Sequence, residues 1–236
     1  MKEYFSKIYQ KGYKSFMMLL EEKLKNDEKT FVITANPETL MIGTENEEFD
    51  RILKSKETII VPDGIGVVKA ANMLEYPVKE RVTGVEIVQG LLHIMNEKKK
   101  KIYFLGAKEE VVNQLVEKVK KEYPNIIVAG FQNGYVSDKD KAFDEMVESE
   151  PDVVLVALGI PTQELLIEKH YERFRKGIFV GVGGSFDVLS GMKKRAPKIF
   201  IKLNLEWLYR IIKEPSRFKR FYKSNIKFIS QIKKMR

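Results

Sequence analysis

The chain has 236 residues, 44% of them hydrophobic, and a formal net charge of +9. This length fits one large α/β domain with a small appendage, and the apolar fraction allows a sizeable core. No uninterrupted apolar run approaches the roughly 18 residues of a membrane span, and the N-terminal residues lack the pattern of a signal peptide. The absence of cysteine excludes disulfides, thiolate nucleophiles and cysteine-bound metals, and it fits a reducing compartment.

Six short runs rich in β-branched and other apolar residues predict strands. Near-continuous hydrophobicity in such runs is typical of strands buried on both faces of a parallel sheet. Between the runs, apolar residues recur at helical spacing, as in Ile87, Leu91 and Met95. The alternation predicts a Rossmann-like, mostly parallel six-stranded α/β sheet flanked by helices. The predicted strands span residues 31–35, 58–61, 102–105, 126–128, 153–158 and 178–181.

Polar residues follow the first two predicted strands, where open α/β sheets bind their ligands. Thr34 and Asn36 end the first strand and suit a sugar hydroxyl, although they also fit a polar turn before the next helix. Asp63 follows the second strand beside Gly64 and Gly66, which leave room for a substrate. It is a candidate general base for an attacking hydroxyl, and the alternative is a cap of the following helix.

Candidate nucleotide contacts follow the fourth and fifth strands. Tyr135 comes after an Asn-Gly pair, so it is either a base contact or simply a residue after a turn. Gln163 and Glu164 are predicted to contact a nucleobase or sugar. Glu164 equally fits an acidic residue in the first turn of a helix.

The sixth strand leads into a glycine-rich loop. Gly181, Gly183 and Gly184 let the backbone approach a ligand closely, and successive N–H groups there can hold an anion. Asp187 is placed to bond a ribose or sugar hydroxyl, and the basic residues 193–195 suit a diphosphate. The segment predicts a nucleotide-binding loop.

From residue 193 onward the chain is basic and amphipathic. We expect an α/β catalytic domain over residues 1–192 and a helical appendage over residues 193–236, with 15 lysines and arginines against Glu206 and Glu214. Such a segment seeks an anionic surface, and its second apolar stripe is typical of a helix in a membrane interface. The alternative is packing on the main domain or on a partner subunit. That stripe comprises Phe218, Phe221, Tyr222, Ile226, Ile229 and Ile232.

Two other classes of function fit less well. A nucleic-acid-binding module would carry basic residues interleaved with stacking aromatics on its body, but the body here is slightly acidic. A nicotinamide-dependent oxidoreductase would have a G-x-G-x-x-G pattern after its first strand, and none follows residue 35. His93 and His170 lie far apart without a second ligand at metal-binding spacing, so no metal site is predicted.

Taken together and in order, these motifs resemble the WecG/TagA/CpsF family of bacterial glycosyltransferases, and within it most nearly the branch that acts in wall teichoic acid synthesis. The resemblance covers residues from about 31 to 221. The matching segments are 34–38, 62–67, 80–86, 158–164, 181–187, 194–197, 205–210 and 214–221.

The resemblance implies an inverting transfer of N-acetylmannosamine from its UDP donor to N-acetylglucosamine on diphospho-undecaprenol, giving a β-linked disaccharide. The alternative within the same fold is another UDP-hexose, used for exopolysaccharide or capsule. Two departures from the family pattern bear on the donor sugar. Thr162 stands where many relatives have lysine, and Glu86 stands where many have aspartate.

The resemblance also implies residue roles. Asp63 corresponds to the proposed general base, and Thr34, Asn36 and Arg81 lie in the segments that line the same catalytic pocket. The residues that correspond to donor-nucleotide contacts are Tyr135, Gln163, Glu164, Gly181, Gly183, Gly184 and Asp187. The tail arginines that correspond to diphosphate ligands are Arg210, Arg217 and Arg220.

These roles imply an enzyme without a cofactor, because arginines replace a metal ion at the diphosphate. The expected partners are the UDP-sugar donor, the lipid-linked acceptor and an anionic membrane surface. The expected location is cytoplasmic, peripheral to the inner face of the membrane. Self-association in solution would hide the apolar stripe of the tail.

Overall fold

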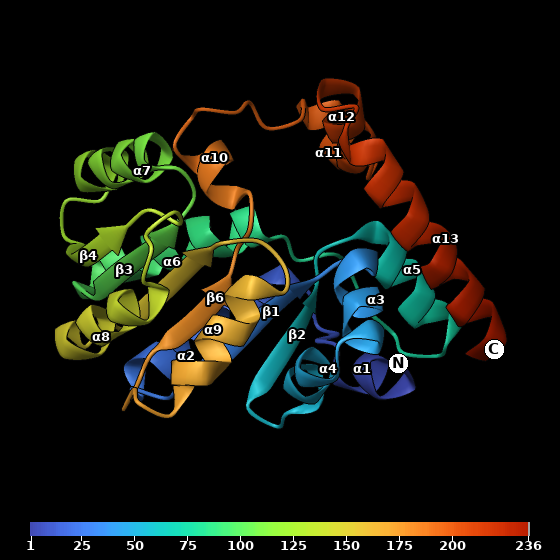
Figure 1. Ribbon diagram of the computed structural model, residues 1–236, viewed down its shortest axis with the longest axis horizontal. Coiled ribbons are helices and arrows are strands. Elements are labelled where there is room, and N and C mark those ends of the chain that lie inside the picture. Colours follow the sequence, from blue (N-terminus) through green and yellow to red (C-terminus); the bar gives the residue numbers. More distant parts are fainter. Residues whose placement is uncertain (236) are drawn as a thin grey trace.

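The computed structural model describes residues 1–235, apart from the side chains of Arg217 and Arg220. At its centre are six parallel strands in the order β2-β1-β6-β5-β3-β4 (Figure 1). The predicted six-stranded α/β sheet is therefore confirmed. The strands are β1 (Thr30–Ala35), β2 (Thr58–Pro62), β3 (Lys101–Gly106), β4 (Ile127–Gln132), β5 (Val153–Ala157) and β6 (Ile178–Gly181).

The inner strands are buried on both faces, as their continuous hydrophobicity predicts. In β5, Val154 and Val156 contribute to one hydrophobic cluster, while Val153 and Leu155 contribute to the cluster on the other face. This period of two places a separate core on each side of the sheet.

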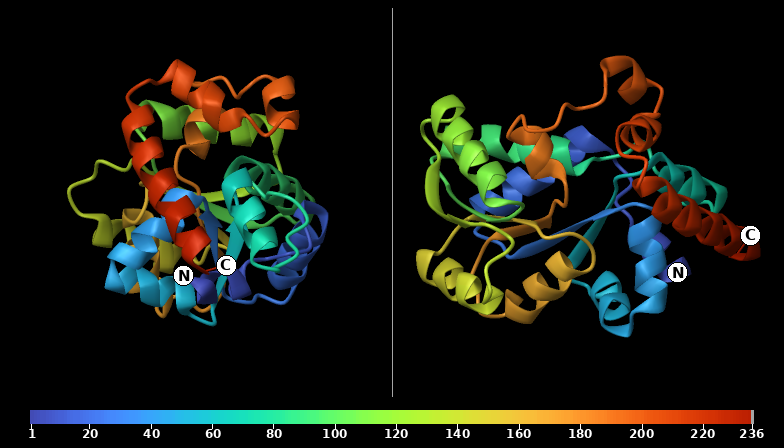
Figure 2. Two further views of the ribbon diagram at one scale, coloured as in Figure 1. Left: turned by 90° about the vertical axis from the view of Figure 1, so that its right-hand side faces the viewer. Right: turned by 45° about the horizontal axis from the view of Figure 1, so that its top comes forward.

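Helices cover both faces of the sheet (Figures 1 and 2). One cluster contains residues of α1 (Lys2–Lys7), α3 (Pro37–Glu45), α4 (Glu47–Lys54), α5 (Ile65–Met73), α8 (Lys139–Ser149), α9 (Thr162–Tyr171) and α13 (Arg217–Met235). The other contains residues of α2 (Tyr13–Lys25), α6 (Gly84–Lys98), α7 (Glu109–Glu122) and α10 (Ser185–Leu189). Two short helices, α11 (Lys198–Lys202) and α12 (Glu206–Lys213), precede α13.

Strand β4 is longer than the predicted run of residues 126–128. It lies at the edge of the sheet, and its side chains Ile127 and Phe131 are exposed. Although α7 and α8 both contact β4, the strand is only partly buried and lacks the continuous apolar run that marks the inner strands. Gly130 stands against the ring of Tyr103, where a Cβ atom would lie 2.4 Å from Cε2. Close packing against Tyr103 of β3, and not a run of apolar residues, therefore accounts for the extent of this strand.

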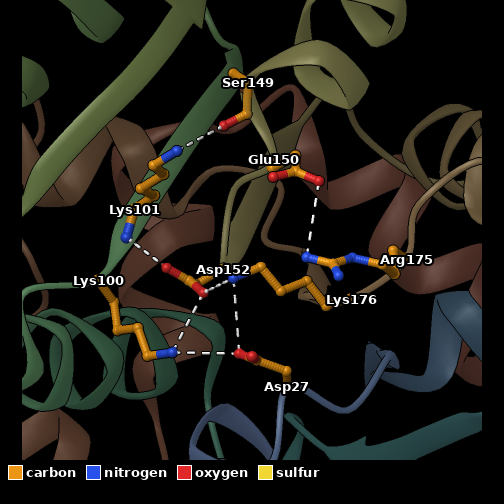
Figure 3. A network of polar contacts seen from close by, with 8 residues as sticks. All are labelled: Asp27, Lys100, Lys101, Ser149, Glu150, Asp152, Arg175 and Lys176. Atoms are coloured by element: carbon orange, nitrogen blue, oxygen red, sulfur yellow. Dashed lines mark hydrogen bonds and ion pairs between the residues drawn. The ribbon is translucent and has the colours of Figure 1, made fainter.

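A buried aspartate organises the amino edge of the sheet (Figure 3). Asp152 is 5% exposed and accepts hydrogen bonds from the backbone N–H of Lys101, at 2.7 Å, and from Nζ of Lys176, at 2.8 Å. Lys100 is a second, more distant cation, with its Nζ 3.4 Å from Oδ1 of Asp152. Burial opposes ionisation of Asp152, but these donors outweigh burial and hold its pKa below the usual value. The network fixes the starts of β3 and β5, at the edge opposite the carboxyl ends.

Helix α13 runs beside α3 and carries two different faces (Figures 1 and 2). Phe228 and Ile232 are 2% and 4% exposed, and they pack into the same cluster as Phe5. Ile232 therefore belongs to the packed face, although its spacing also fits the lipid-facing stripe. Lys227 pairs with Glu45 at the end of α3. The outward face exposes Phe218, Tyr222, Ile226 and Ile229.

Candidate active site

The carboxyl ends of β1, β2 and β6 are neighbours, and the start of α6 lies against them. Gly84 marks this meeting point. A Cβ atom on Gly84 would lie 3.0 Å from Oγ of Ser185 and 3.7 Å from Cγ2 of Thr34. The lack of a side chain thus lets the first turn of α6 approach both the end of β1 and the glycine loop after β6.

Asp63 lies at this meeting point. Its backbone N–H donates to the carbonyl oxygen of Ala35 at 2.9 Å, and its carboxylate accepts a hydrogen bond from the N–H of Gly84. Helix α5 begins after Gly64 without a side-chain cap, so Asp63 does not cap that helix. Its carboxylate instead faces the positive end of α6.

Burial raises the pKa of Asp63 to about 6. The nearby guanidinium groups of Arg210 and Arg81 and the N–H of Gly84 act in the opposite direction, while the negative charge of Glu206 adds to the rise. A carboxyl group with this pKa is ionised at neutral pH yet is a stronger base than an exposed aspartate.

Two arginines meet at Glu206 beside this carboxylate. Arg81 precedes α6 and donates from a terminal nitrogen to Oε2 of Glu206 at 3.1 Å. Arg210 donates to the other oxygen, Oε1, at 2.9 Å. Glu206 is 6% exposed. This ion-pair cluster joins α12 of the C-terminal region to the loop before α6 and brings both arginines to Asp63.

The glycine loop is braced from below by Gln163. Its Oε1 accepts from the backbone N–H of Gly159 at 3.2 Å and from that of Gly183 at 3.1 Å. Its Nε2 donates to Oε1 of Glu164 at 2.7 Å. A Cβ atom on Gly181 would lie 2.6 Å from Nε2 of Gln163, so only glycine fits there. The buried side chain of Gln163 therefore joins the loops that follow β5 and β6.

Glu164 lies beneath the same loop and is 1% exposed. Burial raises its pKa to about 7, against the hydrogen bond from Gln163. In the described part of the chain its Oε2 atom is buried without a hydrogen-bond partner. The backbone of Gly183 is left-handed, with φ of 47°, a conformation that favours glycine at this point of the loop.

Thr34 and Asn36 lie at the same edge but bond within the fold. Thr34 Oγ1 donates to the carbonyl oxygen of Gly181 at 3.0 Å and so ties β1 to the glycine loop. Asn36 Oδ1 accepts from the backbone N–H of Thr39 at 3.1 Å and caps α3. The cap places Asn36 beside Gly64, directly after Asp63.

The two remaining candidates for contact with the donor, Asp187 and Tyr135, lie at different distances from the glycine loop. Asp187 Oδ1 lies 3.6 Å from Nζ of Lys193, which also pairs with Glu214 at 2.8 Å. That bridge links the glycine loop to the end of α12. Tyr135 is 77% exposed after β4, three strands from β6, and the contacts described for its loop join it to Ala107 and not to Asp63.

Two of the predicted diphosphate ligands, Arg217 and Arg220, begin α13. Their side chains lie outside the described part of the structure. Arg210 is thus the tail arginine whose position beside Asp63 is described.

Sequence reasoning passed over two ion pairs at this edge. Glu206 lies four residues before Arg210, a spacing that signals a helical pair, and it is one of two acids in a basic tail. Arg195 donates to Oε1 of Glu86 at 2.9 Å, while Oε2 of Glu86 accepts from the hydroxyl of Thr83 at 2.7 Å. Thr83 and Glu86 form the capping box that begins α6.

An Asp-x-Asp pair, Asp138 and Asp140, is present in the sequence but is engaged elsewhere. Asp138 caps α8 by accepting from the N–H of Lys141. Asp140 pairs with Lys169 at 2.7 Å and with Nε2 of His170 at 2.6 Å. Within residues 1–235, no group of three or more acidic, histidine or cysteine side chains is arranged as a metal site.

A depression of about 450 Å³ lies away from Asp63, at the far end of α3. Its lining includes Glu45, Glu47 and Asp50. Because these carboxylates would repel a diphosphate, the depression does not suit a nucleotide donor.

The chain resembles curated bacterial transferases along most of its length. It is 41% identical over 207 residues, 87% of this chain and 80% of the relative, to the N-acetylglucosaminyldiphosphoundecaprenol N-acetyl-beta-D-mannosaminyltransferase of Bacillus subtilis strain 168. The same figures apply to the enzyme of that name from Bacillus spizizenii. The Staphylococcus aureus strain MW2 enzyme of that name is 37% identical over 191 residues, 80% of this chain and 74% of the relative.

A family model agrees with these pairwise comparisons. The model described as "Glycosyl transferase WecG/TagA/CpsF family" matches residues 6–236, which include every element from α2 to α13. The protein therefore belongs to the WecG/TagA/CpsF family of glycosyltransferases.

Proposed function

We propose that the protein transfers N-acetylmannosamine from UDP-N-acetylmannosamine to N-acetylglucosaminyl-diphospho-undecaprenol and inverts the anomeric centre. The product is the β-linked disaccharide with which the linkage unit of wall teichoic acid begins. The activity for which the two Bacillus relatives are named, at 41% identity over 87% of this chain, supports the choice of substrates. The observation that carries the chemistry is Asp63, a carboxylate with a raised pKa, held between the start of α6 and two arginines.

Asp63 acts as the general base in this proposal. Inverting transfer is a single displacement, in which the acceptor hydroxyl loses its proton as it attacks and the nucleotide diphosphate leaves. A carboxylate with a pKa near 6 is free to accept that proton at neutral pH.

Arginines stabilise the leaving diphosphate in this proposal. Guanidinium groups keep their charge at every relevant pH and donate paired hydrogen bonds to phosphate oxygens. Arg210 is half-exposed beside Asp63, so part of its fork is open to a ligand. Arg217 and Arg220 correspond to diphosphate ligands in the family, and we propose the same role for them here. We therefore propose transfer without a metal ion.

The glycine loop receives the donor in this proposal. Gly183 and Gly184 present their backbone to solvent above the buried Gln163, and α10 begins directly after them. Asp187, in the first turn of α10, is the residue that we propose to bond a hydroxyl of the donor. Tyr135 lies farther along the rim, and we propose that it contacts the donor only at its outer end.

We propose that residues 1–192 form the catalytic domain and residues 193–236 an appendage to it. The outward face of this appendage docks the enzyme on the membrane. Within residues 1–235, no helix has the length and hydropathy to cross a bilayer. The exposed stripe of α13 and the surrounding lysines instead suit an anionic interface, at about 1 kcal/mol for each cation near the surface. The acceptor headgroup is fixed in that plane, so the enzyme acts peripherally at the cytoplasmic face.

The test is release of UDP with a short-chain lipid acceptor and a panel of UDP-sugars. We expect turnover that depends on the acceptor and is highest with UDP-N-acetylmannosamine. We also expect it to persist in EDTA. Higher turnover with another UDP-hexose would overturn the donor assignment, and loss of activity in EDTA with recovery in magnesium would overturn the metal-free mechanism.

A further inference from the structure

Glu206 is a buried carboxylate that joins two arginines of the candidate site. It lies in the first turn of α12 and is 6% exposed. Its two oxygens accept from different partners, Oε2 from Arg81 at 3.1 Å and Oε1 from Arg210 at 2.9 Å. The contact between Arg81 and Glu206 joins segments 125 residues apart in the chain.

A helix-capping role alone does not explain this arrangement. The N-cap of α12 is Leu205, and no side-chain hydrogen bond caps the helix. An acid in a first turn gains from the helix dipole while it remains exposed to solvent. Burial of Glu206 opposes its ionisation, but the guanidinium groups of Arg210, Arg81 and Arg195 outweigh burial and hold its pKa below the usual value. Its carboxylate is therefore ionised at neutral pH.

The charges around Asp63 come from three parts of the chain. Arg81 lies before α6, Gly84 contributes its N–H from the first turn of α6, and Arg210 and Glu206 lie on α12. Burial is the main cause of the raised pKa of Asp63, and the two cations and the N–H group act against it. Among these described groups Glu206 carries the negative charge, which raises the pKa of Asp63. Its ion pairs with Arg81 and Arg210 also orient both guanidinium groups.

We propose that Glu206 is a positioning residue, which holds the guanidinium groups of Arg81 and Arg210 in place beside Asp63. This inference rests on the proposed function, because it gives Asp63 the role of base. In this proposal Glu206 acts through the two arginines and contacts neither substrate. The body and the tail thus each supply one arginine to a single carboxylate.

The test compares Glu206→Gln with Glu206→Asp, because the first removes the charge and the second shortens the side chain. In Glu206→Gln we expect the acid limb of the pH–rate profile to move to lower pH by about one unit, and kcat to fall more than tenfold because the base is weaker and the arginines are loosened. In Glu206→Asp we expect kcat to fall while the acid limb stays in place. If Glu206 had a role in folding alone, the acid limb of Glu206→Gln would stay at the wild-type pH.

A direct titration separates this inference from the proposed function. Carbon-13 NMR of aspartate carboxyl groups, with Asp63→Asn to identify the signal, reports the pKa of Asp63 without any substrate. We expect Glu206→Gln to lower that pKa. An unchanged pKa would overturn the inference even if the wild-type enzyme transfers the sugar, whereas an inactive wild type with the expected titration would overturn only the function.

The matched control is Glu45→Gln. It removes the ion pair of Glu45 with Lys227, which also joins the tail to the body but lies at the end of α3, away from Asp63. We expect its acid limb and its Asp63 titration to match those of the wild type. An equal shift in Glu45→Gln and Glu206→Gln would show a general effect of loosening the tail and would contradict the assignment.

Discussion

At the scale of single residues, the site depends on a carboxyl group whose ionisation is costly. Asp63 titrates with a pKa of about 6, above the ordinary value of 3.8, because it is buried. Asp152, at the other edge of the sheet, has the opposite environment and a lowered pKa. The fold thus contains one aspartate that is stabilised as an anion and another that is held ready to take a proton.

This difference predicts opposite effects of two similar substitutions. At pH 4, Asp63 is protonated in the folded chain and close to its midpoint of 3.8 in the unfolded chain, so Asp63→Asn changes stability little. Above pH 6 the folded protein carries a costly anion there, and Asp63→Asn should raise the free energy of unfolding by about 2 kcal/mol. Urea unfolding at pH 4 and pH 7.5 measures the effect.

Asp152→Asn is the control. Its lowered pKa stabilises the fold above the unfolded value, so this substitution should destabilise the protein at pH 7.5 and matter less as the pH falls. A loss of stability in Asp63→Asn at pH 7.5 would contradict the account of Asp63.

At the scale of elements, the glycine loop depends on the absence of side chains. Gly181→Ala would place a Cβ atom 2.6 Å from Nε2 of Gln163 and 2.8 Å from Oε1 of Glu164. Since both partners are buried, we expect a loss of about 1–3 kcal/mol in stability and weaker UDP binding by calorimetry. Gly191→Ala is the matched control, because no atom lies within 4 Å of its Cβ position, although its φ of 91° costs some stability. Equal UDP affinity in Gly181→Ala and wild type would contradict the role of this loop.

The two faces of α13 have different tasks in this account. Ile226 and Ile229 are 47% and 53% exposed on the outward face. Changing either to aspartate should weaken sedimentation with phosphatidylglycerol vesicles about tenfold, because it removes apolar contact and adds a repelled charge, while the fold remains intact. Ile127→Asp is the control, since Ile127 is 49% exposed on the edge strand β4. Equal vesicle binding by all of these proteins would contradict docking through α13.

At the scale of the whole molecule, local pattern predicted the sheet, and long-range contacts determined much of the site. Inner strands such as β5 can be predicted from continuous apolar runs, because both of their faces are covered by helices. The position of Asp63 at a strand end followed from the same reasoning. The extent of β4 did not, because this edge strand is only partly buried and carries a mixed pattern.

The role of Glu206 could not be predicted from the sequence, because it depends on a long-range contact. Its partner Arg81 is 125 residues away, and no local spacing records that contact. The two faces of α13 were mixed for a related reason. Phe228 and Ile232 are as apolar as Ile226 and Ile229, and only the packing on α3 and α1 distinguishes them.

The most direct measurement is turnover of Asp63→Asn in the UDP-release assay, with UDP affinity measured on the same protein. Asparagine keeps the size of the side chain and can still accept from the N–H of Gly84, but it cannot take a proton. The account predicts a loss of at least about 100-fold in kcat with UDP affinity within a few fold of the wild type. Turnover near the wild-type rate in this variant would contradict the assignment of Asp63 as the base.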